Sequence, residues 1–343
     1  VQPAEAPTSS LEGSLPKIES RGIPLKTIVY PKVQYDFVDE TGAPFTTPLG
    51  FSGNYLAKIG SKEAPLISLP APYNKLYGQA NGAGSYILSI NNNAGFPLTP
   101  QIIEQYGAGG TTPSTKYHVE FQLDKLNIVT SLKFVDSIEY DSTAGSYWYV
   151  YMYKGFHLTT GVFDDSIEEG RVTPMSATNK DRTFQKNTLG SFEIIKPTTL
   201  SINSGGYPNW VTTGYNSITL RGFDGTNTIK SKMIYKVTRK QVTENFVDTN
   251  GTKITPPTGF TQNKKTPMTS NNYTFKQAGT LPDTYTTGGK TYKFKGWYKG
   301  KTKPNTLTAT KAPSYAVTYD DNDDLNVVYE EIKVLEFPSR TYQ

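Results

Sequence analysis

The stretch VTENFVDTNGTKITPPTGF (residues 242–260) repeats an earlier stretch, VQYDFVDETGAPFTTPLGF (residues 33–51). The two align without a gap at an offset of 209, and nine of the 19 positions are identical, where chance would give about one. The shared residues include a Phe-Val-Asp triplet, a glycine three residues after the aspartate, and a final Gly-Phe pair. A repeat of this kind indicates two related structural units in one chain.

Each copy predicts a β-hairpin. A strand ends at Val-Asp, the chain turns at Glu-Thr-Gly or Thr-Asn-Gly, and a second strand begins. Asn250-Gly251 is a strong hairpin signal, because both of its residues can take positive φ. Asp39 and Asp248 are expected to bind nearby backbone amides and so to fix the turn.

The second copy continues into a longer pattern. We expect strands near 271–276, 291–299 and 325–332. The segments FVDTNGTKI, TYKFKGWYKG and YAVTYDDNDDLNVVYEE together resemble the MucBP-type repeats of Gram-positive surface proteins. KFKGWYKG is also similar to the core of the related Listeria–Bacteroides and internalin B-type repeats.

The resemblance covers residues 241–333 and, more faintly, the start of 28–112, where the first copy departs after Phe51 into the Asn/Gly-rich GQANGAGSYILSINNNAG. It implies a small β-grasp-like module on an exported, often wall-anchored protein, and no catalytic residue. Isopeptide bonds from lysine to asparagine or aspartate join strands in some Gram-positive surface domains. Here they stay a hypothesis, because the sequence does not show which residues would pair.

Composition limits the alternatives. The 343 residues allow two or three domains, and the abundance of tyrosine, glycine and proline suits strands joined by turns. A net charge of +5 without a basic run gives little support to nucleic-acid binding. Cysteine is absent, which excludes disulfides and thiolate chemistry. No apolar stretch approaches the ~20 residues of a membrane span.

The middle of the chain predicts short strands: YHVEFQL, LNIVTSLKF, SYWYVYMY, SFEIIKP, SITLRGF and KMIYKVT. Strands separated by turn residues are typical of a β-sandwich. The only helix signal is TPQIIEQYGAGG, in which Pro100 suits the first turn and Gly107 the stop.

A row of tyrosines is the candidate ligand site. In SYWYVYMYKG, four tyrosines occupy every second position, so a strand would place them on one face. An exposed aromatic row could stack against sugar rings or contact a protein, although packing against a neighbouring loop or domain is the more common use of such a stripe. The four residues are Tyr147, Tyr149, Tyr151 and Tyr153.

Two acidic stretches are weaker candidates. Asp320, Asn322, Asp324 and Glu331 occupy positions one, three, five and twelve of a calcium-loop count, but Leu325 stands where that loop needs glycine. We therefore interpret this stretch as an acidic turn before an edge strand. VFDDSIEEGRV could supply paired carboxylates to a glycosidase, but we expect a solvated loop there.

We therefore expect a mainly β, multi-domain, elongated chain: a β-sandwich plus small β-grasp-like modules. The expected parts are a flexible lead-in such as follows a cleaved signal peptide (1–27), a β-grasp-like or elaborated first unit (28–112), a β-sandwich (113–240), a MucBP-like module (241–333) and a tail (334–343).

The expected function is that of a non-catalytic, exported surface protein of a Gram-positive bacterium, secreted or bound to the cell wall, which acts in adhesion or as a stalk presenting a binding surface. We expect a monomer without cofactors, whose partner is a host or cell-wall glycan or protein. The alternatives are a carbohydrate-binding module with its glycan site on the middle domain, and, less favoured, a glycoside hydrolase-like middle domain.

Overall fold

The structure is a computed structural model of the whole chain, and it is mainly β, with 50% of residues in strands and 2% in helix. The residues that it describes are 28–60, 67–97, 105, 116–141, 143–146, 148–157, 162–172, 183–195, 219–220, 227–229 and 231–333. The expected mainly β fold class is confirmed. Of the helix expected at TPQIIEQYGAGG only Gln105 is described, and the expected lead-in and tail lie outside the described residues.

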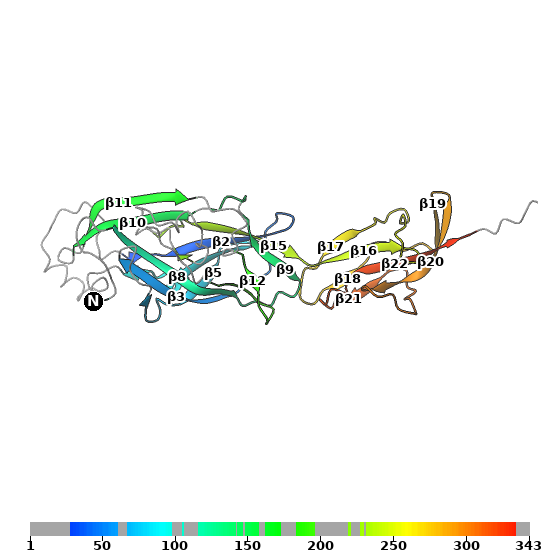
Figure 1. Cartoon of the computed structure of the whole chain (residues 1–343), viewed down its shortest axis with the longest axis horizontal. Coiled ribbons are helices and arrows are strands. Elements are labelled where there is room, and N and C mark those ends of the chain that lie inside the picture. The colour runs from blue at the N-terminus through cyan, green and yellow to red at the C-terminus, as the bar shows by residue number, and fades with distance from the viewer. Residues whose placement is uncertain are drawn as a thin grey trace, which may run out of the picture. The chain divides into compact units, whose positions relative to one another are not determined.

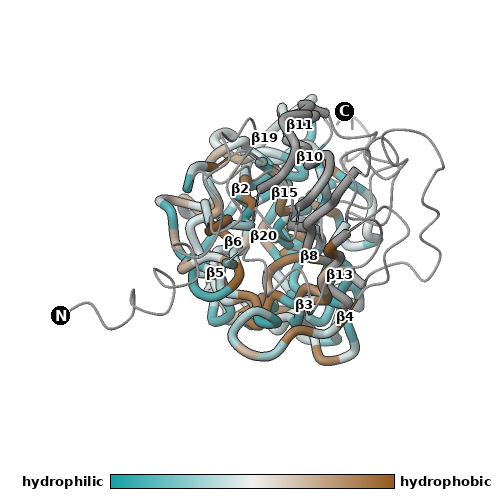
Figure 2. The backbone as a smooth tube through the Cα atoms, turned by 90° about the vertical axis from the view of Figure 1, so that its left-hand side faces the viewer, coloured by the Kyte–Doolittle hydropathy of each residue, from teal (hydrophilic) through white to brown (hydrophobic). Residues whose placement is uncertain are grey.

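The chain divides into two compact units. Unit 1 comprises Val1–Ser131 and Ser137–Thr238, and unit 2 comprises Leu132–Asp136 and Arg239–Gln343. Each unit is built from β-sheets (Figure 1). Hydrophobic and hydrophilic residues alternate over short distances along the chain (Figure 2), as expected for strands with one face turned to a core.

Unit 2 has a five-stranded sheet in the order β17-β16-β22-β20-β19. Its central strands β16 and β22 are parallel, and β22 is antiparallel to β20. The expected strands near 271–276, 291–299 and 325–332 are confirmed as β18, β20 and β22. The bounds are β16 Gln241–Val247, β17 Lys264–Pro267, β18 Thr274–Lys276, β19 Thr284–Thr287, β20 Lys290–Lys299, β21 Ser314–Ala316 and β22 Leu325–Ile332.

One sheet of unit 1 has the same central arrangement. Its order is β5-β6-β2-β15-β9, and β2 is parallel to β15. Tyr35 pairs with Met233 there, and its repeat equivalent Glu244 pairs with Leu325 in unit 2. The two copies therefore form the same kind of core, a first strand parallel to a much later one. The bounds are β2 Lys32–Asp39, β5 Leu76–Ala80, β6 Ser85–Ile90, β9 Val135–Tyr140 and β15 Lys232–Arg239.

The turn after each first strand is the same in both copies. Asp39 Oδ1 accepts hydrogen bonds from the backbone N–H groups of Thr41 (2.8 Å) and Ala43 (3.2 Å). Asp248 Oδ1 accepts from those of Asn250 (2.8 Å) and Thr252 (3.0 Å). The expected role of both aspartates is confirmed.

The expected turn at Thr-Asn-Gly is confirmed, and positive φ occurs at its glycine alone. Gly251 has φ +82°, but Asn250 is not among the residues with positive φ. Gly251 N–H donates to the Asp248 carbonyl, and Asp248 N–H donates to the Thr252 carbonyl. This is the bonding of a three-residue hairpin loop that ends on a left-handed glycine, because Thr249 adds one residue to the loop.

The second sheet of unit 1 runs in the order β11-β10-β8-β13-β12, with β3 and β14 also paired to β8 and β4 paired to β3. β3 pairs with β8 from Phe51↔Ile128 to Gly60↔His118, so strands from the ranges 28–112 and 113–240 share this sheet within unit 1. The bounds are β3 Phe51–Gly60, β4 Ile67–Ser68, β8 Lys116–Ile128, β10 Trp148–His157, β11 Val162–Val172, β12 Gln185–Lys186, β13 Phe192–Ile195 and β14 Thr219–Leu220. The small pair β1 Ile28–Val29 and β7 Phe96–Pro97 completes the unit.

The core of unit 1 is rich in tyrosine. Tyr35 and Tyr235 stack with ring centroids 5.3 Å apart, and Tyr140 meets Tyr235 edge-on at 6.0 Å. These three side chains and Tyr55 are each at most 2% exposed. Unit 1 therefore buries several tyrosines, and a tyrosine in this unit does not by itself indicate an exposed surface.

Candidate functional site

The tyrosine row lies on strand β10, as the alternation predicted. Tyr149, Tyr151 and Tyr153 are alternate positions of this strand, and their register with β11 is regular up to Tyr153. β10 also pairs with β8 through Tyr153↔Tyr117, so β11 is the terminal strand of the sheet. Tyr147 lies outside the described residues, and so do the side chains of the other three.

The acidic stretch VFDDSIEEGRV forms strand β11, so the expected loop is wrong. Glu169 pairs with Tyr151 and Glu168 with Met152, and the register shifts between residues 153 and 156. The antiparallel pairing with β10 supplies the backbone hydrogen bonds that hold these acidic residues in extended structure. The four acidic residues of this strand are Asp164, Asp165, Glu168 and Glu169.

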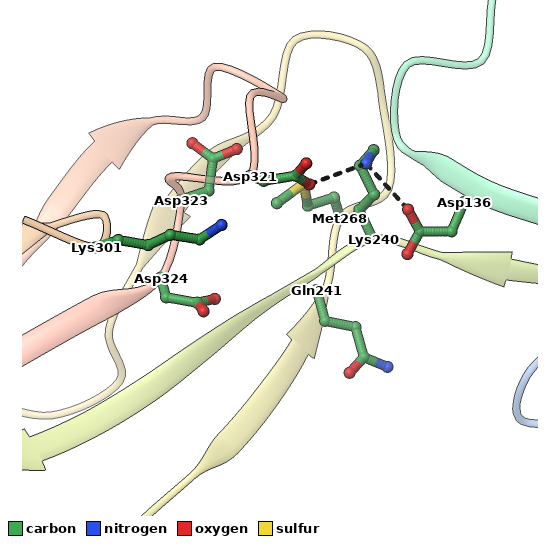
Figure 3. A pocket seen from close by; sticks show the side chains of 8 residues that line it. All are labelled: Asp136, Lys240, Gln241, Met268, Lys301, Asp321, Asp323 and Asp324. Atoms are coloured by element: carbon green, nitrogen blue, oxygen red, sulfur yellow. Dashed lines mark ion pairs between the residues drawn. The ribbon is translucent and has the colours of Figure 1, made fainter.

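A polar pocket of about 300 Å³ lies in unit 2 (Figure 3). Its centre is an ion-pair cluster, in which Lys240 Nζ lies 3.0 Å from Asp136 Oδ1 and 3.6 Å from Asp321 Oδ1. Partial burial alone would lower the pKa of Lys240, but the hydrogen bonds and charges of the two aspartates outweigh it and raise that pKa. The lining residues are Asp136, Lys240, Gln241, Met268, Lys301, Asp321, Asp323 and Asp324.

The acidic loop beside this pocket is held by its own carboxylates. Asp323 is 5% exposed, and its two oxygens accept 2.8 Å hydrogen bonds from the backbone N–H groups of Thr318 and Tyr319. Lys299 Nζ lies 3.2 Å from Asp323 Oδ1. Asp324 Oδ1 accepts from Thr243 N–H at 2.8 Å, which ties the loop to the start of β16. These bonds give Asp323 and Asp324 structural roles.

The residues of the weak calcium-loop candidate make other contacts or lie in a strand. Asp320 Oδ1 accepts from Thr318 Oγ1 and from Asn322 N–H, and the Thr318 hydrogen bond is the main reason that the pKa of Asp320 is lowered. Glu331 lies in β22, opposite Tyr292. In the part of the chain that the structure describes, no three His, Asp or Glu side chains are placed to hold a metal ion together.

The pocket can bind a small polar or charged group through its lysines and aspartates. Its lining includes no serine, histidine or cysteine. Sequence reasoning missed this pocket, because Asp136, Lys240 and Lys301 are far apart in sequence and belong to no motif. Only the Asp-rich stretch at 320–324 gave a local signal.

Comparison with known proteins adds no family. No family model matches the chain, and no curated protein matches its sequence. Among the described residues, no helix is both long enough and hydrophobic enough to cross a membrane.

Proposed function

We propose that the chain is a non-catalytic, exported surface protein of a Gram-positive bacterium that acts in adhesion, with repeated β modules that present a binding surface. One observation carries this proposal: the two copies of the repeat share the same aspartate-pinned turn and the same parallel pairing of a first and a last strand. The contacts that the two copies share are structural ones. A repeated scaffold of this kind is typical of a protein that displays or spaces a site.

The binding surface of this proposal is the β10–β11 hairpin in unit 1. The hairpin lies in the segment between β9 and β15, which has no counterpart between β20 and β22 of unit 2. An addition to one copy of a repeated scaffold is a reasonable place for a function that the other copy lacks. The row at Tyr149, Tyr151 and Tyr153 belongs to this addition.

The carbohydrate-binding alternative is favoured by the regularity of β10. Alternate residues of a strand are roughly 6.6 Å apart, and β10 is in unbroken register with β11 over the tyrosine row. A row of rings at that spacing could stack on successive sugars of a glycan, whereas a protein partner would also need apolar contacts around the row.

The experiment is a binding screen with a matched stability measurement. The whole chain is tested against cell-wall polysaccharides, host glycans and host matrix proteins, beside the double variant Tyr149→Ala/Tyr151→Ala. The proposal expects binding by the parent chain, at least a tenfold loss in the variant, and melting temperatures within about 2 °C of each other, because truncation of exposed side chains usually changes stability by less than ~0.5 kcal/mol. Loss of stability in the variant would assign the tyrosines to packing.

A control variant lies in the same hairpin. Glu169, which pairs with Tyr151, is changed to Gln to alter charge while retaining shape. If binding depends on the aromatic row, Glu169→Gln keeps most of the affinity. Release of reducing sugar from any glycan in the screen would contradict the non-catalytic assignment.

A further inference from the structure

Lys32, the first residue of β2, has an unusual environment. It is 4% exposed, yet in the described part of the chain its Nζ has no carboxylate partner. Its polar contacts are two asparagine side chains: Nζ touches Asn227 Oδ1 and lies 3.4 Å from Asn93 Oδ1. The ring of Tyr30 is 5.8 Å away. A buried ammonium group is normally paired with an opposite charge, so this arrangement calls for a chemical reason.

The environment makes the ammonium group easier to deprotonate than that of an exposed lysine. Burial lowers the pKa of Lys32, because it penalises the charged form, and the carboxamides supply no negative charge to restore it. A neutral lysine amine is a nucleophile. The carbonyl carbon of Asn227 is about 1.2 Å, one C=O bond, from the oxygen that Nζ touches. The amine therefore lies against the carboxamide group whose carbon it would attack.

We propose that Lys32 and Asn227 are joined by an intramolecular isopeptide bond. The Nζ lone pair attacks Asn227 Cγ and forms a new C–N bond, and the Cγ–Nδ2 bond breaks. One proton passes from Nζ to the departing Nδ2, which leaves as ammonia. The sum is amine plus carboxamide giving a secondary amide plus ammonia, so no oxidant, reductant or cofactor is consumed.

The backbone on both sides holds the pair in place. Gln34 N–H donates to the Ser231 carbonyl at 3.0 Å, and Gln34 pairs with Lys232 in the parallel ladder, so the segment that follows Asn227 is tied to β2. Asn93 ends a turn whose three asparagines have φ of +50°, +48° and +61°. Asn93 Oδ1, at 3.4 Å, is the longer of the two contacts of the amine, and Asn227 supplies the reacting carbon.

The bond would change how the chain carries force. It would close a loop between two residues separated by 195 positions. A force applied through the residues before Lys32 and after Asn227 would pass through the cross-link and leave the loop without tension. The strands of the hairpin β10–β11 lie within that loop. The proposed bond does not depend on the proposed binding function.

The direct test is the intact mass of the purified whole chain under denaturing conditions. The proposal expects a mass ~17 Da below that of the sequence, for one ammonia lost. Trypsin should fail to cleave after Lys32 and should release a branched peptide in which residues 27–58 are joined to residues 222–230. A full mass with normal cleavage after Lys32 would overturn the proposal without any variant.

Variants assign the bond. Lys32→Arg and Asn227→Ala should each restore the full mass, and Asn227→Asp should lose ~18 Da, one water, in place of ammonia. Asn93→Ala is the matched control, since it removes the other carboxamide and should keep the bond. Loss of ammonia that persists in Asn227→Ala would place the bond elsewhere and refute the pairing.

Force spectroscopy tests the consequence. A chain held by its two ends should lack the extension of the closed loop, which for 195 residues is roughly 640–700 Å at ~3.3–3.6 Å per residue. Lys32→Arg should show that extension. If parent and variant unfold to the same length, no cross-link is present.

Discussion

Removal of the turn aspartates, one copy at a time, tests whether the repeat conserves a structural device. Asp39 and Asp248 are equivalent, and each accepts two backbone N–H groups. They differ in burial, because Asp39 is 8% exposed whereas Asp248 is only half-buried. Asp39 also accepts from Thr41 Oγ1. The same substitution should therefore cost more in unit 1 than in unit 2.

The magnitudes follow from the type of bond. Loss of a side-chain cap on backbone amides costs about 0.5–2 kcal/mol, and we expect about 1 kcal/mol for Asp248→Ala. Buried hydrogen bonds to a charged group are stronger, at about 1.5–3 kcal/mol, and we expect about 2–3 kcal/mol for Asp39→Ala. The two Asp→Asn variants are the controls, because the carboxamide oxygen still accepts and most of the loss should be recovered.

The assay is calorimetry of the whole chain, in which we expect a transition for each unit. Unit 2 is a domain of about 100 residues, so 1 kcal/mol should lower its transition by about 4–8 °C. Unit 1 is about twice as long, so 2–3 kcal/mol should lower its transition by about 4–12 °C. Equal free-energy losses in the two variants, or no loss in either, would show that these aspartates do not stabilise the turns in proportion to their burial.

Three further predictions concern turns, ionisation and the acidic loop. Gly42→Ala should cost about 1–2 kcal/mol from its left-handed φ alone, because nothing lies within 4 Å of a new Cβ. Gly84→Ala should cost clearly more in thermal unfolding, because its Cβ would lie 2.7 Å from a backbone oxygen. The pKa of Tyr315 is raised by burial and then by nearby carboxylates. The stability that this shift gives is fully present below the unfolded pKa of about 10 and decreases as the pH rises above it. Ultraviolet titration of Tyr315→Phe should show one fewer late-ionising phenol than the parent chain. Asp323→Ala should lower the stability of unit 2 by about 2–3 kcal/mol in denaturant unfolding, because it removes the hydrogen bonds of a buried carboxylate. Asp320→Ala, at an exposed site, should change it little.

Local features of the fold could be predicted from the sequence. The strand before each Val-Asp, the turn at Gly42 and Gly251, and the strands around Trp297 and Val327 all follow from alternation and turn residues close together in the chain. The turn at Thr249-Asn250-Gly251 follows from its Asn-Gly pair, although only Gly251 takes positive φ.

Long-range features could not be predicted. The pairing of β2 with β15 joins residues about 200 positions apart, and no local pattern encodes it. Strand β11 looked like a loop because its acidic residues are poor strand formers, and pairing with β10 overrides that preference. The pocket of unit 2 and the contact between Lys32 and Asn227 depend on tertiary structure alone.

The most direct test of the proposed function is the affinity of the whole chain for its best ligand from the binding screen, measured before and after Tyr149→Ala/Tyr151→Ala by calorimetry, with the melting temperature of both proteins recorded. We expect saturable binding, a dissociation constant at least ten times larger in the variant, and an unchanged melting temperature. Equal affinity in the two proteins would contradict the proposal, as would a variant that loses binding only because it unfolds.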